Sequence, residues 1–341
     1  MKTALVGLGR MGWGCHLPEI LKHKEYSLCA AVDTNAARLE ELREKYGISG
    51  YQDYQKMLEK EKPELVVIVT PSVLHEKQAI AALRAGANVL LDKPMSTSYE
   101  EASHIQKTVQ ETGRKLVVYQ SARYSDKSIA AQNIISRGIL GPIYQIKCSD
   151  YDYVRRNDWQ AFKECGGGML FNYAPHQLDL ALFLAKDKAK RFFCSVRNIA
   201  TMGDAEDVVR LLIETEKGMI LDVDINTASA LKASTLTIWG KYGTASVEND
   251  QDGNRALHVK YYVPQMLETQ VASSELEMKE RKYPRENIPW KEEWIPLKYV
   301  DRRDFYGDCF AYFKGVGKSP VPLEETVDVM RILEECRKYR E

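Results

Sequence analysis

The sequence predicts two α/β domains, the first with a doubly wound parallel sheet and the second with a large, mostly antiparallel open sheet. Over roughly the first 120 residues, short fully apolar runs alternate with helical segments. Strands that are buried on both faces of a parallel sheet show this pattern. After about residue 141, strand patterns follow one another with few helices between them. We therefore expect domains at 1–121 and 122–341.

The first domain contains five expected strands, namely Ala4–Val6, Leu28–Val32, Leu65–Val69, Val89–Leu91 and Leu116–Tyr119. A helix is predicted over Asn35–Tyr46, because leucines recur at helical spacing before a terminating Gly47. Another is predicted over Ser98–Thr112, where Ser98 and Glu101 form a capping-box pattern. Alternation of this kind indicates a doubly wound sheet.

The second domain contains six expected strands, namely Ile143–Tyr151, Arg191–Ala200, Asp207–Glu214, Met219–Ile225, Ala233–Trp239 and Thr244–Glu248. The segment Glu216-Lys217-Gly218 is typical of a hairpin turn, and Glu324–Tyr339 is expected to form the last helix. Residues 274–293, within the wider stretch 263–298, indicate a surface excursion that is either a solvated loop or a lid.

Composition excludes several classes of protein. With 48 basic and 48 acidic side chains the net charge is zero, and nothing indicates a nucleic-acid or membrane-surface partner. The seven cysteines lack metal-site spacing, so we expect free thiols in a reducing compartment and no metal. No apolar run approaches the ~20 residues of a membrane helix. We therefore expect a cytoplasmic protein.

The strongest motif is Gly7-Leu8-Gly9-Arg10-Met11-Gly12, which fits G-x-G-x-x-G directly after a strand. Gly7 makes the tight turn, Gly9 lets the backbone approach a pyrophosphate, and Gly12 lets the helix pack on the strand. The helix N-terminus adds free N–H groups for the phosphates. Gly7, Gly9, Arg10, Met11 and Gly12 are therefore candidate cofactor-binding residues.

Asp33 ends the second strand, where a carboxylate can accept the hydroxyls of an adenosine ribose. Such a carboxylate would repel a 2′-phosphate, so NAD is favoured over NADP. Arg38 argues the other way, because a nearby arginine accommodates that phosphate. A purely structural role for Asp33, capping the helix that follows, also stays open.

Other candidates follow the carboxyl ends of later strands, where open α/β folds bind their ligands. Thr70-Pro71 and His75 follow one strand, and Asp92-Lys93-Pro94 follows the next. The proline restricts the backbone at Lys93, which helps to aim its ammonium group. Gln120 follows the last strand, and its amide is expected to meet the nicotinamide ribose or carboxamide.

A glycine run, Gly166-Gly167-Gly168, leads into a segment carrying Asn172 and His176. Because Pro175 is tolerated only in a first helical turn, we expect a helix to begin near Phe171 or Asn172. Asn172 and His176 would then share a face. Histidine suits general acid–base chemistry at neutral pH, although a lone helical histidine is more often structural.

Taken in order, these motifs resemble the Gfo/Idh/MocA family, which includes glucose-fructose oxidoreductase and inositol 2-dehydrogenase. The resemblance implies an N-terminal Rossmann domain and a C-terminal α/β domain whose open sheet joins a homodimer or homotetramer. It also implies that Lys93 and His176 do the chemistry. Hydride would pass between a sugar or cyclitol hydroxyl and NAD or NADP.

Two positions depart from the family pattern. Asp92 replaces the usual glutamate before the lysine, which is a mild change. Asn172 replaces an aspartate that precedes the histidine by one turn. An amide cannot raise the pKa of His176 as a carboxylate would, but it can still bind a substrate hydroxyl. Further substrate contacts are expected from Arg123, Tyr153, Arg155 and Trp159, with Arg155 and Arg156 as anion holders.

Two other functions stay open. Some proteins resembling this family are glycosidases that oxidise, eliminate and re-reduce with no net redox change. Others, such as the yeast galactose-pathway corepressor, bind the dinucleotide as regulators without turnover. Retention of both Lys93 and His176 favours catalysis.

Overall fold

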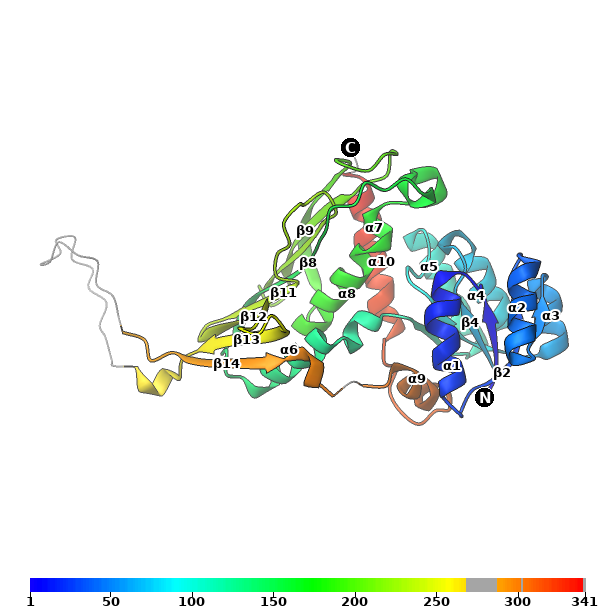
Figure 1. The fold of residues 1–341 in the computed structure, drawn as a ribbon, viewed down its shortest axis with the longest axis horizontal. Helices are drawn as coiled ribbons and strands as arrows, with labels where there is room; N and C mark the ends of the chain where they lie inside the picture. Colours follow the sequence, from blue (N-terminus) through cyan, green and yellow to red (C-terminus); the bar gives the residue numbers. More distant parts are fainter. Residues whose placement is uncertain (268–286, 302, 340–341) are drawn as a thin grey trace, which may run out of the picture.

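A computed structural model describes residues 1–267, 287–301 and 303–339, and it shows the two expected sheets (Figure 1). All six strands of the first sheet are parallel, in the order β3-β2-β1-β4-β5-β6. The strands are β1 (Lys2–Val6), β2 (Ser27–Val32), β3 (Ser49–Tyr51), β4 (Leu65–Ile68), β5 (Asn88–Leu91) and β6 (Leu116–Val118). Five of the six match expected strands, and β3 was not predicted.

Helices cover both faces of this sheet because its strand residues alternate between two hydrophobic clusters. Leu5 and Val67 face one cluster, and Ala4 and Val66 face the other. The helices of the first half are α1 (Leu17–Lys22), α2 (Ala36–Tyr46), α3 (Tyr54–Glu61), α4 (His75–Arg84) and α5 (Tyr99–Thr112). Two of them confirm the expected helices, with Asn35 and Ser98 capping their N-termini.

The second sheet has eight strands in the order β14-β13-β12-β11-β7-β10-β9-β8. Only the β7–β10 pair is parallel. The strands are β7 (Ile143–Tyr151), β8 (Ala189–Arg197), β9 (Val208–Thr215), β10 (Ile220–Asn226), β11 (Leu236–Gly240), β12 (Gly243–Asn249), β13 (Arg255–Tyr261) and β14 (Lys291–Pro296). Six were expected, and the hairpin at Gly218 is confirmed. Of the excursion predicted at 274–293, residues 274–286 lie outside the described residues, and the prediction is wrong from Lys291 onward, where β14 begins.

The remaining helices are α6 (Asp126–Arg137), α7 (Met169–Asn172), α8 (Ala174–Ala185), α9 (Phe305–Phe313) and α10 (Leu323–Arg337). In Figure 1, α6, α8 and α10 lie between the large sheet and the N-terminal domain. Leu221, Val223 and Ile225 of β10 pack into the core that contains α8 and α10. The alternate residues of β10 therefore face away from the helices.

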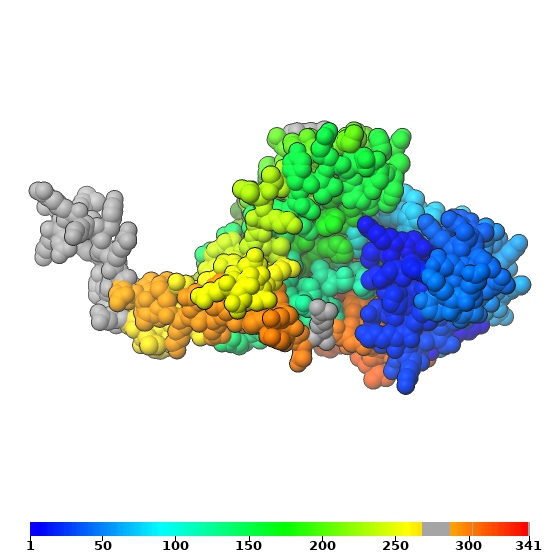
Figure 2. Space-filling model, viewed as in Figure 1, coloured from blue at the N-terminus to red at the C-terminus, as the bar shows by residue number. Residues whose placement is uncertain are grey.

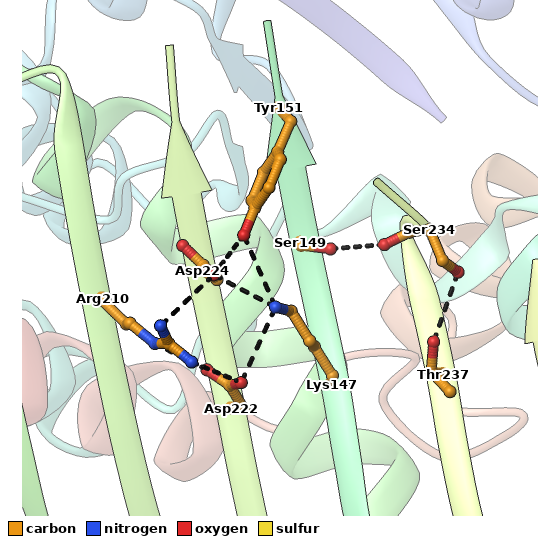
Figure 3. Close-up of polar contacts among 8 residues, drawn as sticks. All are labelled: Lys147, Ser149, Tyr151, Arg210, Asp222, Asp224, Ser234 and Thr237. Atoms are coloured by element: carbon orange, nitrogen blue, oxygen red, sulfur yellow. Dashed lines mark hydrogen bonds and ion pairs between the residues drawn. The ribbon is translucent and has the colours of Figure 1, made fainter. Parts of the chain in front are cut away.

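This outer face of the large sheet carries charges that satisfy one another (Figure 3). Lys147 lies 3.1 Å from Asp224 and 3.8 Å from Asp222, and Arg210 pairs with Asp222 at 3.1 Å. Tyr151 donates a hydrogen bond to Asp224. Asp222 and Asp224 are each only 5% exposed. Their carboxylates are therefore buried beneath the basic side chains that pair with them.

The C-terminal part of the chain returns to the first domain. Phe305, Tyr306, Cys309 and Phe313 of α9 belong to the same hydrophobic cluster as Leu5 of β1. Figures 1 and 2 show this orange-to-red segment against the blue N-terminal residues. The domain boundary expected at residue 121 assigns α9 to the second domain, although α9 packs on the first.

Two general features of the chain complete the fold. All seven cysteines have free thiols, as expected, and four of them are buried. Within residues 1–267, 287–301 and 303–339, no helix combines the length and apolar character that crossing a bilayer requires.

Candidate active site and dinucleotide cradle

The expected site residues gather at the carboxyl edge of the parallel sheet because each directly follows a strand. Gly7 follows β1, Asp33 follows β2, and Thr70, Lys93 and Gln120 follow β4, β5 and β6. The strand hydrogen bonding extends into these loops: Gly7 N donates to Val32 O at 2.8 Å, and Asp92 N donates to Ile68 O at 2.8 Å. Parallel topology therefore brings these distant segments together.

The three motif glycines have different physical requirements. Gly7 has a φ of +98°, and an added Cβ would lie 2.6 Å from Val69 O. At Gly12 an added Cβ would lie 1.9 Å from Gly7 O, so only glycine closes the turn. At Gly9 no atom lies within 4 Å of that position. The space before Gly9 is thus free for the close approach of a ligand, as the motif predicts.

The segment after the glycines starts with a π-helical turn, Gly12–His16, and continues as α1. The backbone N–H of Trp13 donates to Gly9 O at 2.8 Å. Arg10 is exposed and Met11 is half-buried at the rim of this turn. The helical start directly after the loop supplies N–H groups and a positive dipole end for phosphate.

The Asp33 carboxylate binds two backbone N–H groups and still has acceptor capacity for a ligand. Its Oδ2 accepts from Leu8 N at 2.8 Å, and its Oδ1 accepts from Asn35 N at 2.8 Å. Arg38 lies 3.3 Å from Asp33 Oδ2. A carboxylate has about four acceptor positions, so capacity remains for ribose hydroxyls. The side chain that caps α2 is that of Asn35 rather than Asp33.

Gln120 and His75 are buried in different ways. Gln120 is 1% exposed, and its Oε1 has no hydrogen-bond partner in the described part of the chain. Such an orphaned acceptor fits an amide donor of a cofactor.

His75 is also 1% exposed, but its ring nitrogens lie 2.8 Å from Pro94 O and 2.8 Å from Thr70 O. His75 therefore ties the two loops together. Pro71 is exposed, and the Thr70 hydroxyl donates to Gln78 at 2.5 Å.

Lys93 joins the two domains. Its Nζ donates to Asn172 O at 2.6 Å and to Asn172 Oδ1 at 3.1 Å. Burial lowers the pKa of Lys93, the Asp92 carboxylate opposes that change, and Arg10 adds to it. The pKa of Lys93 is thus set by burial and by the charges of these two neighbours.

The helix expected near Phe171 begins earlier and is broken, which corrects the prediction. α7 ends at Asn172, Tyr173 forms the junction, and α8 begins at Ala174 with Pro175 in its first turn. The break occurs because proline has no N–H to continue the preceding turn. Asn172 points to Lys93 and, through Nδ2, donates to Gln160 Oε1 at 3.2 Å.

His176 is held neutral by its surroundings. Burial is the largest cause that lowers the pKa of His176 to about 3, and the charges of Lys93 and Lys127 add to it. Its Nδ1 is buried without a hydrogen-bond partner among the described residues. The imidazole is therefore unprotonated at ordinary pH, so one ring nitrogen is free to accept a hydrogen bond from a hydroxyl.

The structure does not place every expected substrate residue at this centre. Arg123 is 3% exposed and forms a two-pronged bond to Asp179, at 2.8 and 2.6 Å, and a 2.7 Å pair with Glu325. Its Nε and Nη2 are used within the fold, so we do not carry its substrate role forward. Arg156 likewise pairs with Asp158 at 2.9 Å.

Tyr153, Arg155 and Trp159 lie in the stretch after β7, and all three are exposed. In the described part of the chain, no hydrogen bond or ion pair joins them to Lys93, Asn172 or His176. Gln160, next to Trp159, is the residue of this stretch that reaches Asn172. These three side chains therefore remain candidates for the rim of the site.

Sequence reasoning missed Lys127 on α6. Its Nζ donates to Thr235 O at 3.3 Å, and burial lowers the pKa of this lysine. Its charge also contributes to the lowered pKa of His176. Lysine usually lies at the surface, so no sequence signal marked it.

Models of one protein family match both halves of the chain. The model "Oxidoreductase family, NAD-binding Rossmann fold" matches residues 1–120, and the "GFO/IDH/MocA C-terminal domain" matches residues 129–246. The chain therefore belongs to the Gfo/Idh/MocA oxidoreductase family, as its motifs suggested.

Curated relatives support this membership at low identity. The chain is 30% identical over 192 residues to a 1-carboxy-3-chloro-3,4-dihydroxycyclohexa-1,5-diene dehydrogenase of Comamonas testosteroni (55% of this chain, 48% of the relative). It is 28% identical over 188 residues to the D-glucoside 3-dehydrogenase of Escherichia coli (54% and 54%). A scyllo-inositol 2-dehydrogenase (NADP(+)) of Bacillus subtilis is 26% identical (54% and 51%). The matches span about half the length of these relatives.

Solved structures share the fold along nearly the whole chain. An NAD-binding protein from Listeria innocua has a TM-score of 0.82 at 21% identity, covering 99% of this chain and 94% of its own. The WlbA dehydrogenase from Bordetella pertussis, solved with NADH and UDP-GlcNAcA, has a TM-score of 0.76 at 21% identity, covering 100% and 96%.

Proposed function

We propose that this chain is an NAD(P)-dependent dehydrogenase that acts on a secondary hydroxyl of a sugar, sugar derivative or cyclitol. The observation that carries the proposal is the meeting of Lys93 with the α7–α8 segment, which carries Asn172 and His176. In this proposal the Lys93 cation and the neutral His176 imidazole act beside the dinucleotide cradle. Relatives named as glucoside and inositol dehydrogenases support the substrate class.

The residues present fit a dinucleotide, with Gly9 facing open space and Gln120 offering a free acceptor. A bound nicotinamide would supply the hydride acceptor. His176, which is unprotonated at neutral pH, takes the proton of the substrate hydroxyl. Lys93 stabilises the developing negative charge on that oxygen. Asn172 accepts from the Lys93 ammonium through Oδ1, and the amide N–H that Gln160 does not use is offered to the substrate.

The test is a screen of about fifty sugars, sugar acids and inositols for formation of reduced nicotinamide, with NAD and with NADP. We expect Lys93→Met and His176→Gln to lower turnover at least about a hundredfold, as for loss of a general base or charge stabiliser. Lys77→Met and His104→Gln change exposed residues of the same types and serve as controls. Full turnover in both site variants would refute the assignment.

NAD is the cofactor that we propose, because Asp33 lies at the end of β2. Arg38 is the residue that works against this preference. We expect the kcat/KM ratio for NAD over NADP to fall in Asp33→Ser, with circular dichroism as the check that the loop still folds. A ratio that favours NADP in the wild type would contradict the role given to Asp33.

We also propose that a second copy of the chain covers the outer face of the large sheet. The family resemblance implies this arrangement, and Phe193 and Leu212 leave apolar surface there, at 64% and 43% exposed. Light scattering should show a dimer or tetramer, and Phe193→Arg with Leu212→Arg should shift it toward monomer.

A further inference from the structure

A buried carboxylate lies directly beside the proposed catalytic lysine. Asp92 precedes Lys93 and is 8% exposed. Burial alone would raise the pKa of Asp92, but His16, Lys93 and His75 hold that pKa below its usual range. Asp92 therefore keeps its negative charge, and that charge raises the pKa of the neighbouring residue in the chain, Lys93, against the effect of burial.

His16 faces this carboxylate from the π-helical turn after the glycine loop. It is fully buried, and its Nε2 lies 3.9 Å from Asp92 Oδ1. Within the described residues, neither of these two buried atoms has a hydrogen-bond partner. The two unpaired atoms are thus separated by about 1 Å more than a hydrogen-bond distance.

The other side of the His16 ring is fixed by α9. Nδ1 of His16 lies 2.7 Å from the hydroxyl of Tyr306, which is 1% exposed. The Tyr119 ring packs on His16 with centroids 4.5 Å apart. The imidazole therefore has one polar neighbour near each ring nitrogen and an aromatic ring packed on its face.

The chemistry of these neighbours selects one tautomer. An ionised carboxylate can only accept, so the proton of a neutral His16 belongs on Nε2. Nδ1 is then an acceptor, and the Tyr306 hydroxyl donates to it. The result is a chain of oriented groups from Tyr306 through His16 to Asp92 and Lys93.

We propose that His16, oriented by Tyr306, holds the Asp92 carboxylate in place as the counter-charge of Lys93, so that both are positioning residues for the reaction. This inference rests on the proposed function of Lys93. The titratable groups that act on Asp92 are His16, His75 and Lys93, and Asp92 in turn acts on Tyr119 and His176.

The first test needs no substrate. The full chain has six histidines, so 15N-histidine labelling with single substitutions assigns each imidazole in an NMR spectrum. We expect His16 to carry its proton on Nε2 at neutral pH, and Asp92→Asn to relax that preference. An Nδ1-protonated His16, or a tautomer unchanged in Asp92→Asn, would overturn the inference.

The second test is the pH profile of kcat/KM. When Asp92 is no longer held in place, its charge stabilises the Lys93 ammonium less, and the pKa of Lys93 falls. The alkaline limb of the kcat/KM profile should therefore move to lower pH. We expect a shift of about one unit, or about tenfold in rate on that limb, in His16→Leu and Tyr306→Phe. His16→Gln keeps an N–H toward Asp92 and should restore most of the profile.

Tyr26→Phe is the matched control, because Tyr26 donates to the backbone oxygen of Tyr306 and, among the described residues, makes no hydrogen bond or ring contact with His16. It removes a buried hydroxyl from the same cluster and should leave the profile unchanged. Equal shifts in Tyr26→Phe and Tyr306→Phe would mean that the effect is only structural. If no substrate is found, the NMR result still decides the His16–Asp92 pairing.

Discussion

The side chains of the proposed chemistry acquire their properties from burial and from one another. Lys93 reaches Asn172 across the domain junction, and the charge of Lys93 helps to keep His176 neutral. The amide at position 172 therefore binds the lysine rather than the imidazole.

Because of His176, the free energy of unfolding should decrease as the pH falls below neutral. The unfolded chain protonates this histidine near pH 6.5, but the folded chain resists until its pKa of about 3. Between these values the unfolded state binds more protons, so stability declines as pH falls from about 6.5. His176→Gln should decline less in urea unfolding measured from pH 7 to pH 4.5. Identical slopes for the two proteins would contradict the buried neutral state.

Substitutions of the loop glycines should affect folding at one position and cofactor binding at another. Gly12→Ala places a Cβ 1.9 Å from Gly7 O, so it should lower the melting temperature. Gly9→Ala meets no atom within 4 Å, so it should fold normally and lose NAD affinity. Gly14→Ala, also facing open space, is the control that should keep both. Calorimetry and cofactor titration measure the two effects, and normal NAD affinity in Gly9→Ala would count against the cradle.

Residues whose role depends on a local motif could be predicted from the sequence. The glycine loop, Asp33 and Lys93 each follow a strand directly, and topology then places them together. His16 and Lys127 could not be predicted, because their importance arises from neighbours distant in sequence. The partners of Arg123 could not be predicted for the same reason, since Asp179 and Glu325 are distant from it in sequence.

At the scale of elements, the sequence predicted most strands and helices, but not their irregularities. The π-helical turn at Gly12–His16 and the break at Tyr173 both lie beside the site. The turn brings His16 toward Asp92, and the break lets Asn172 and His176 take different neighbours. Periodicity cannot reveal such features, because they shift a pattern by only a residue or two.

The Arg123–Asp179 pair should be one of the strongest ties between elements. It joins the turn after β6 to α8, and both side chains are almost fully buried. Arg123→Met leaves a buried carboxylate unpaired and should cost about 3 kcal/mol of unfolding free energy. Arg43→Met, in the exposed pair with Glu40, should cause no measurable change. Chemical denaturation compares the two, and a similar small loss in both would refute the structural role.

At the scale of the molecule, the chain closes on itself through α9. This return could not be predicted, because residues 303–321 carry no signal that says which domain they cover. Asp304 caps α9 by accepting from Gly307 N at 3.0 Å, and it also binds His23 Nε2 at 2.8 Å. The cap of α9 is thereby joined to the end of α1.

The His23–Asp304 contact should weaken as pH rises. Burial opposes protonation of His23, but the Glu19 carbonyl and the Asp304 carboxylate outweigh it and raise the pKa of His23. The stabilisation is complete below about pH 6.5 and is lost as pH rises through the raised value. Asp304→Asn keeps the cap but loses the charge, costing within about 1 kcal/mol because Asp304 is half-exposed. The loss should be larger at pH 5.5 than at pH 9, and an equal loss at both would contradict it.

The central claim is that Lys93 and His176 act together on a substrate hydroxyl beside a bound nicotinamide. The most direct measurement is the rate of reduced-nicotinamide formation with the polyol panel, in the wild type and in Lys93→Met and His176→Gln. The account predicts turnover of at least one sugar or cyclitol by the wild type and its near-complete loss in both variants. Cofactor binding without net reduction of nicotinamide on any member of the panel, or undiminished turnover in the variants, would contradict it.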